Sequence, residues 1–179
     1  MKKSLIIVLT VIMLMTAGCS NSRNGKVPVS SATENVSVAD KWEYEVYIDN
    51  IDYYMAAYST ALEDEYAAIE NQDIDELEKA YKKCVSALKD FYDIPCPDSL
   101  KEEHDEFMTL IDRDKTGYEL LLEAIHYERN SQNLTASEQE EMARLEAEID
   151  EHFSYTEDPD SINLWDAKVK LIEAASKFI

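Results

Sequence analysis

Glycine is scarce in this chain of 179 residues, which contains only three glycines, four prolines and three cysteines. Phosphate-binding loops, dinucleotide-binding turns and the Gly-x-Ser-x-Gly nucleophile elbow need several glycines at fixed positions, so the sequence excludes these sites. Basic residues are also few, 17 against 38 acidic residues. Because nucleic-acid phosphates bind Lys and Arg, this charge argues against a nucleic-acid partner.

The amino terminus carries the longest apolar run of the sequence. Lys2 and Lys3 precede an apolar stretch at residues 5–15, and three small residues then lead to Cys19. A helix that crosses a membrane needs about 20 apolar residues, so this run is too short to be one. The order of basic, apolar and small residues predicts a cleavable export signal over residues 1–18.

The end of that signal, Thr16-Ala17-Gly18-Cys19, resembles the lipobox of bacterial lipoproteins. The resemblance implies attachment of a diacylglyceryl lipid (a palmitate-type anchor) to Cys19 and cleavage before it. It therefore implies a protein held at the extracytoplasmic face of the cell membrane. Thr16 departs from the family pattern, in which leucine is commoner. The alternative is an ordinary secretory signal followed by a coincidental cysteine.

The charge of the exported chain limits its partners. Without residues 1–18 the chain has 15 basic and 38 acidic residues and a net charge of −23. Anionic lipid headgroups repel such a surface, so the lipid holds the protein while the domain is repelled. The charge favours basic peptides, cations, or neutral surfaces bound through apolar contacts. We expect a non-catalytic module that binds a protein or a basic peptide, although a solvated acidic exterior also accounts for most of these charges.

The chain divides into two parts behind the signal. Residues 19–40 are rich in Ser, Asn and Val, have no helical period, and predict a flexible tether. Residues 41–179 have the length of one typical domain. No stretch of four or more residues alternates apolar and polar side chains between turn signals, so we predict no sheet. Short connections between helical segments favour an all-α antiparallel bundle of about five helices.

In each of five segments, apolar residues recur every three or four positions, as on one face of a helix. The residues expected to face the core are Ile48, Ile51, Met55, Tyr58, Leu62, Tyr66 and Ile69 in the first segment; Ile74, Leu77, Tyr81, Cys84, Leu88 and Phe91 in the second; Leu100, Phe107, Met108, Ile111, Tyr118, Leu121, Leu122 and Ile125 in the third; Met142, Leu145, Ile149 and Phe153 in the fourth; and Ile162, Trp165, Val169, Ile172 and Phe178 in the last, which follows a loop around Pro159.

Capping boxes predict where three of these helices begin. The pairs are Asp73 with Glu76, Ser99 with Glu102, and either Thr135 with Glu138 or Ser137 with Glu140. Pro95 and Pro97 end the second helix, because proline cannot continue one.

Lipidation of Cys19 would leave Cys84 and Cys96 in an oxidising compartment. A helix advances ~1.5 Å per residue and an extended chain ~3.3 Å, so the chain after the second helix can return far enough for the two sulfurs to meet. The sequence predicts a Cys84–Cys96 disulfide that stabilises the fold by about 2–3 kcal/mol. The alternative is two buried thiols, since free cysteine packs as a small apolar residue.

The most specific polar pattern lies at residues 112–123 and resembles the EF-hand calcium loop. Asp112, Asp114 and Thr116 match its first three ligand positions, Gly117 its sharp turn and Glu123 its closing ligand. This resemblance implies a calcium-binding module as the alternative function. Glu119 stands where the family has an apolar residue, and the chain contains no second loop. The competing interpretation is an unbroken third helix.

No catalytic residue, resident metal site or cofactor is predicted. Glu123 and His126 form a Glu-x-x-His pair, but di-iron bundles need two such pairs. The other histidines lack the partner, and no general base can be named, so we do not expect an enzyme. The segment Ser99–His104 and the proline before it resemble uncharacterised helical lipoproteins of Gram-positive bacteria over residues 95–125, which implies no known chemistry.

Six of the eleven tyrosines fall in the first helix: Tyr44, Tyr47, Tyr53, Tyr54, Tyr58 and Tyr66. Neighbouring positions on a helix point about 100° apart, so at least one of Tyr53 and Tyr54 is expected near the surface. Exposed tyrosines beside acidic residues are typical of binding faces. Aromatic rings at the rim of the bundle are the alternative.

Overall fold

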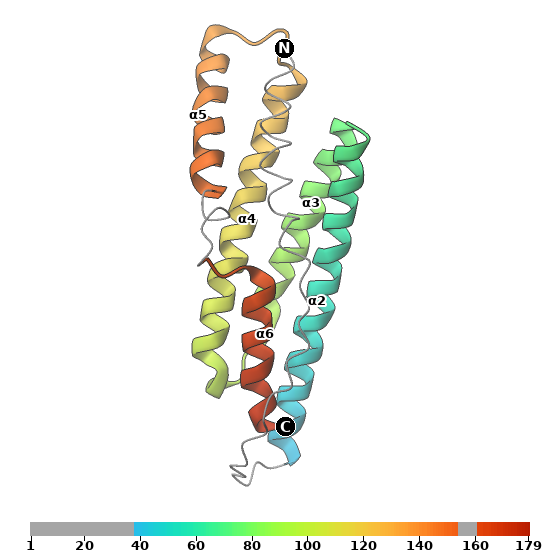
Figure 1. Ribbon diagram of the computed structural model, residues 1–179, viewed down its shortest axis with the longest axis vertical. Coiled ribbons are helices and arrows are strands. Elements are labelled where there is room, and N and C mark those ends of the chain that lie inside the picture. The colour runs from blue at the N-terminus through green and yellow to red at the C-terminus, as the bar shows by residue number, and fades with distance from the viewer. Residues whose placement is uncertain (1–37, 154–160) are drawn as a thin grey trace.

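The computed structural model describes residues 38–153 and 161–179 (Figure 1). Its helices are α2 (Val38–Glu70), α3 (Ile74–Asp90), α4 (Lys101–Arg129), α5 (Ala136–Phe153) and α6 (Leu164–Ala175), with short 3-10 turns η2 (Phe91–Asp93), η3 (Asp98–Leu100) and η5 (Ser176–Phe178). There is no strand in these ranges, so the predicted all-α bundle of five helices is confirmed. The export signal, Cys19, the tether up to residue 37 and the loop at Pro159 lie outside the described residues, and α2 includes the last three residues of the expected tether, 38–40.

The helices are arranged around α4, the helix that contacts α3, α5 and α6. The helices α2 and α3 form an antiparallel pair, and α3 packs against α4. Figure 1 shows α5 along the C-terminal half of α4 and α6 along its N-terminal half, where α6 also reaches α2. A single long helix therefore supports two shorter ones placed end to end.

Local hydrogen bonds explain where the helices begin. Gln72 adopts a positive φ of 53°, which turns the chain after α2, and the Asp73 side chain then caps α3 by accepting from the amides of Asp75 and Glu76. At α5 the Thr135–Glu138 alternative is confirmed. The Thr135 amide donates to the Glu138 carboxylate at 2.7 Å, and the Glu138 amide donates back to the Thr135 hydroxyl at 3.3 Å.

The predicted Ser99 cap is wrong. The N-cap position of α4 is occupied by Leu100, which makes no side-chain capping bond, and η3 comes directly before it. The Ser99 hydroxyl instead hydrogen-bonds the hydroxyl of Tyr44 near the start of α2. This contact joins two segments far apart in sequence.

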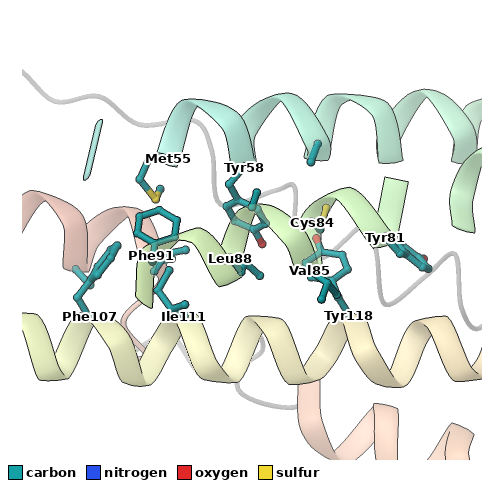
Figure 2. Packing of buried hydrophobic residues seen from close by; sticks show 14 of the residues in the cluster. Met55, Tyr58, Tyr81, Cys84, Val85, Leu88, Phe91, Phe107, Ile111 and Tyr118 are labelled. Carbon is teal, nitrogen blue, oxygen red and sulfur yellow. The ribbon is translucent and has the colours of Figure 1, made fainter. Parts of the chain in front are cut away.

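The core is rich in aromatic residues and lies between α2, α3 and α4 (Figure 2). Its largest fully buried side chains are Tyr47, Tyr58, Tyr81, Tyr118, Phe91, Phe107, Ile51, Leu88, Leu100, Ile111 and Leu121. Burial of one such side chain contributes roughly 1.5–3 kcal/mol, so this layer is the main source of stability. Most of the apolar faces predicted for α3, α4 and α5 are confirmed.

The predicted face of α2 is confirmed except at Tyr66, and the predicted face of α6 is wrong. On α2, Tyr66 is 48 % exposed, whereas its neighbour Glu65 is only 2 % exposed. Val169 of α6 is 54 % exposed, and Ile162, which comes just before this helix, is 41 % exposed. The buried residues of α6 are Leu164, Ala167, Leu171, Ala174 and Ala175. The small alanines let α6 approach its neighbours closely. The pattern of large apolar residues in the sequence indicates the adjoining face of this helix instead.

Candidate functional site

The segment that resembles a calcium loop is helical, so the competing interpretation, an unbroken third helix, is confirmed. Residues 112–123 lie inside the continuous helix α4, so the EF-hand-like loop is not formed. The Thr116 hydroxyl donates to the Asp112 carbonyl at 2.8 Å, and the Tyr92 hydroxyl donates to the Asp112 carboxylate. Glu123 points to solvent. Within the part of the chain that the structure describes, no group of three or more His, Cys, Asp or Glu side chains is placed to hold a metal ion.

Gly117 has a packing role instead. A Cβ atom at this position would lie 2.4 Å from Cζ of Phe153 and 3.1 Å from Nε2 of His152. Nε2 of His152 also hydrogen-bonds the Arg113 carbonyl at 2.9 Å. The glycine therefore lets the end of α5 reach the backbone of α4.

The predicted disulfide is not formed, because Cys84 and Cys96 are both free thiols. Cys84 lies in the core between helices, near Tyr118, whereas Cys96 lies beside Tyr47. Tyr47 belongs to the first part of α2, and Tyr58, which also contacts Tyr118, is eleven positions further along. At ~1.5 Å per residue this places the two thiols about 16 Å apart along the bundle. The chain after η2 continues away from Cys84 and does not fold back to it.

Cys96 belongs to a cluster at the end of the bundle where α2 begins. The hydroxyl of Tyr47 hydrogen-bonds Nδ1 of His104 at 2.7 Å, so the histidine bonds across to α2 and not within its own helix. Burial raises the pKa of Tyr47, and Cys96 and Glu103 add to the shift. Burial, with help from the charge of Asp105, raises the pKa of Cys96 to about 11. The thiol stays protonated near neutral pH and is not an activated nucleophile.

An open surface hollow of about 760 Å³ lies next to this cluster. Its lining consists of Asp98, Ser99, Lys101, Glu102, Glu103, Asp105, Glu106 and Thr109. We call this the acidic hollow. It contains five carboxylates and one lysine, and none of these six groups forms an ion pair with a described residue. Acidic groups on α2, α3 and α5 are partly neutralised by bridges such as Lys83–Asp64 and Arg144–Glu141. The hollow therefore concentrates negative charge at one end of the molecule.

A second unusual group is the buried carboxyl of Glu65 in the centre of the bundle. The Tyr118 hydroxyl donates to its Oε2 at 2.8 Å, while its Oε1 has no hydrogen-bond partner. The Tyr81 hydroxyl is also buried without a partner. Burial raises the pKa of Glu65 to about 7, against a smaller lowering by the bond from Tyr118. Sequence periodicity missed this residue because a carboxylate is not counted as part of an apolar face.

The tyrosines of α2 do not form one face. Tyr44, Tyr47 and Tyr58 are buried, whereas Tyr53 is 70 % exposed, which confirms that one of the Tyr53–Tyr54 pair lies at the surface. Tyr53 and Tyr54 contact each other edge to face. None of these residues lines the acidic hollow.

In comparisons with known proteins, no family model matches the chain, and no curated protein and no solved structure matches it. None of the helices in the described ranges has the length and apolar character needed to cross a membrane. The geometry of the chain itself is therefore the basis for a functional proposal.

Proposed function

We propose that this protein is a lipid-anchored module at the extracytoplasmic face of a bacterial membrane, and that its acidic hollow binds the cationic groups of a basic peptide or protein. The lipobox-like sequence ending at Cys19 supports the anchor. The hollow supports the ligand class, because a concave surface lined with carboxylates attracts positive charge and raises its local concentration.

The observation that carries the proposal is the excess of carboxylates without ion-pair partners at the hollow. Five carboxylates surround a single lysine, and none of them is ion-paired within the described ranges. Like charges at such a density repel one another, and this repulsion favours binding of a cationic ligand. The hollow's size suits several side chains of a peptide and exceeds what a single ion needs.

The position of the hollow also fits an anchored protein. The Tyr44–Ser99 hydrogen bond places the rim of the hollow beside the first turns of α2. Lys41 donates to the carbonyl of Ile179 at 2.6 Å at the same end. Figure 1 shows the start of α2 and the C-terminus together at this end. The first described turns of α2 therefore lie at the same end of the domain as the proposed binding surface.

The test compares charge-neutral variants of the full-length chain in detergent. The hollow variant combines Glu102→Gln, Asp105→Asn and Glu106→Gln, and binding of a lysine-rich peptide is measured by calorimetry at several salt concentrations. We expect affinity to fall at least tenfold and the salt dependence to weaken, because fewer charges meet in the complex.

The matched control removes the same charge elsewhere, with Glu63→Gln, Glu140→Gln and Asp150→Asn, which are exposed on α2 and α5. It should bind nearly as well as the unmodified chain. Equal losses in the two variants would mean that net charge alone attracts the peptide, and would overturn the hollow as the site. The anchor has its own test: fatty-acid labelling of the protein in a bacterial host should disappear in Cys19→Ala.

A further inference from the structure

We propose that Glu65 is a pH-sensitive switch in the core. When its carboxyl group loses its proton, the packed layer between α2, α3 and α4 opens. This inference does not depend on the ligand of the acidic hollow. It rests on the position of one carboxyl group and on the side chains that surround it.

The carboxyl group is placed where only its neutral form is tolerated. Glu65 is 2 % exposed and occupies the apolar face of α2 between Ala61 and Ala68, both of which are buried. It receives one hydrogen bond, from Tyr118, and its other oxygen has no partner. Burying a charge that has a single hydrogen-bond donor is far more costly than burying a neutral carboxyl. Deprotonation therefore favours conformations in which this side chain reaches water.

The groups that face Glu65 from the packed helices do not compensate for its charge. Tyr58 comes from α2, Tyr81 and Cys84 from α3, and Tyr118 from α4. Burial raises the pKa of each of these groups, so all four remain neutral in the range in which Glu65 titrates. Glu65 is thus the single member of the cluster that changes charge near neutral pH.

Cations on the neighbouring helices are paired with other carboxylates. Lys83 of α3 pairs with Asp64 at 2.6 Å, and Lys115 of α4 lies 3.8 Å from Glu119. Arg113 of α4 pairs with Asp114 at 3.3 Å, and the charge of Asp114 raises the pKa of Tyr58. No cation contributes to the pKa shift of Glu65, so a carboxylate there would add negative charge that no partner balances.

Cys84 provides a local reporter of the opening. Its thiol is fully buried and belongs to the same cluster, so a thiol reagent reaches it only when the layer opens. The experiment uses the full chain with Cys19→Ala and Cys96→Ser, which leaves Cys84 as the sole thiol. The rate of reaction with 4,4′-dithiodipyridine is measured at each pH for the folded chain and for the same chain in denaturant. The protection of Cys84 is the rate in denaturant divided by the rate in the folded chain, and this ratio removes the intrinsic pH dependence of the reaction.

We expect this protection of Cys84 to fall by about 30-fold between pH 5.5 and pH 8, the change that follows if Glu65 titrates near 7 in the closed layer and near 4.5 in the open one. In Glu65→Gln the protection should not change with pH, because the amide cannot ionise. Glu63→Gln, an exposed neighbour on α2, should retain the full decrease. The proposal fails if the decrease persists in Glu65→Gln, or if protection in the unmodified chain is constant.

A second measurement does not require the variant to fold. Infrared titration of the unmodified chain should show a protonated carboxyl that loses its proton near neutral pH, well above the range of the surface carboxylates. If every carboxyl group is ionised by pH 6, Glu65 does not act as a pH-sensitive switch.

Discussion

The ring of Phe153 occupies the space that a side chain at position 117 would need. An added Cβ atom on Gly117 would lie 2.4 Å from Cζ and 2.8 Å from Cε1 of that ring, closer than carbon atoms approach in proteins. The contact joins the last residue of α5 to the middle of α4. Close packing between two helices explains a glycine that resembles the turn of a calcium loop.

Gly117→Ala should therefore destabilise the protein although alanine is the better helix former. The helix itself would gain about 1 kcal/mol. Displacing the Phe153 ring from a packed site costs typically 1–3 kcal/mol, and we expect a net loss of about 1 kcal/mol in urea unfolding. The neighbouring Thr116→Ala, at an exposed position of the same helix, serves as the control and should be neutral or slightly stabilising.

Replacing Phe153 with a smaller residue tests whether its ring causes the loss of stability in Gly117→Ala. In a chain that already carries Phe153→Leu, the further change Gly117→Ala should cost much less than it does alone, because the obstructing atoms are gone. Equal costs in the two backgrounds would show that the Phe153 contact is not what excludes a side chain at this position.

Calcium should have no selective effect on stability. An EF-hand ligand set requires its first eight residues to leave the helix, whereas residues 112–123 stay helical. A site with a Kd near 10 μM would add roughly 2.7 kcal/mol at about 1 mM calcium. We expect the thermal midpoint of the full chain in calcium to equal that in magnesium. A calcium-specific rise that disappears in Asp112→Ala would show that the helix gives way to a loop.

The fold was predictable where apolar size and helical period agree. Leu121 of α4 and Leu145 of α5 lie on their predicted faces because a large side chain at helical spacing has nowhere else to be buried. The prediction failed on α6, where Ala167 and Ala174 face the core. Alanine gives little signal in a hydrophobic pattern, yet it lets two helices approach closely. Periodicity alone therefore chose a face about 100° away.

The two candidate sites could not be predicted from the sequence, for a different reason. Glu65 lies at helical spacing from the buried Tyr58 and Ile69, but a carboxylate is not counted as part of an apolar face, and its burial depends on Tyr118, 53 positions later. The carboxylates of the acidic hollow are local in sequence, from Asp98 to Glu106, but their lack of partners depends on which elements pack nearby. The calcium-loop resemblance did not hold because residues 112–123 continue the helix α4. The predicted disulfide was wrong because spacing in sequence does not give the distance between two elements that pack apart.

The corrected face of α6 can be tested by two truncations. Leu171→Ala removes a side chain that is 1 % exposed and should cost about 2–5 kcal/mol in urea unfolding. Val169→Ala removes one that is 54 % exposed and should change stability by no more than about 0.5 kcal/mol. If the two losses were reversed, the face chosen from the sequence would be right and the packing of α6 described above would be wrong.

The buried Glu65 should also set how stability depends on pH. Because the pKa of Glu65 is raised in the folded state, from 4.5 to about 7, the folded chain holds this proton more tightly than the unfolded chain does. Stability contributed by the neutral group is complete below about pH 4.5, is lost as the pH rises toward 7, and changes little above that. The total change corresponds to about 3 kcal/mol, of which about 2 kcal/mol falls between pH 5.5 and pH 8.

The surface carboxylates also contribute to the pH profile, so the difference between two proteins is the quantity to measure. Denaturant unfolding of the unmodified chain and of Glu65→Gln should give similar free energies at about pH 4, below the range in which Glu65 titrates. At pH 8 the variant should be the more stable of the two by about 3 kcal/mol, about 2 kcal/mol of which develops between pH 5.5 and pH 8, because its amide carries no charge to desolvate. Parallel pH profiles would mean that Glu65 titrates at the same pH in the folded and unfolded chains, and that water reaches it in the native bundle.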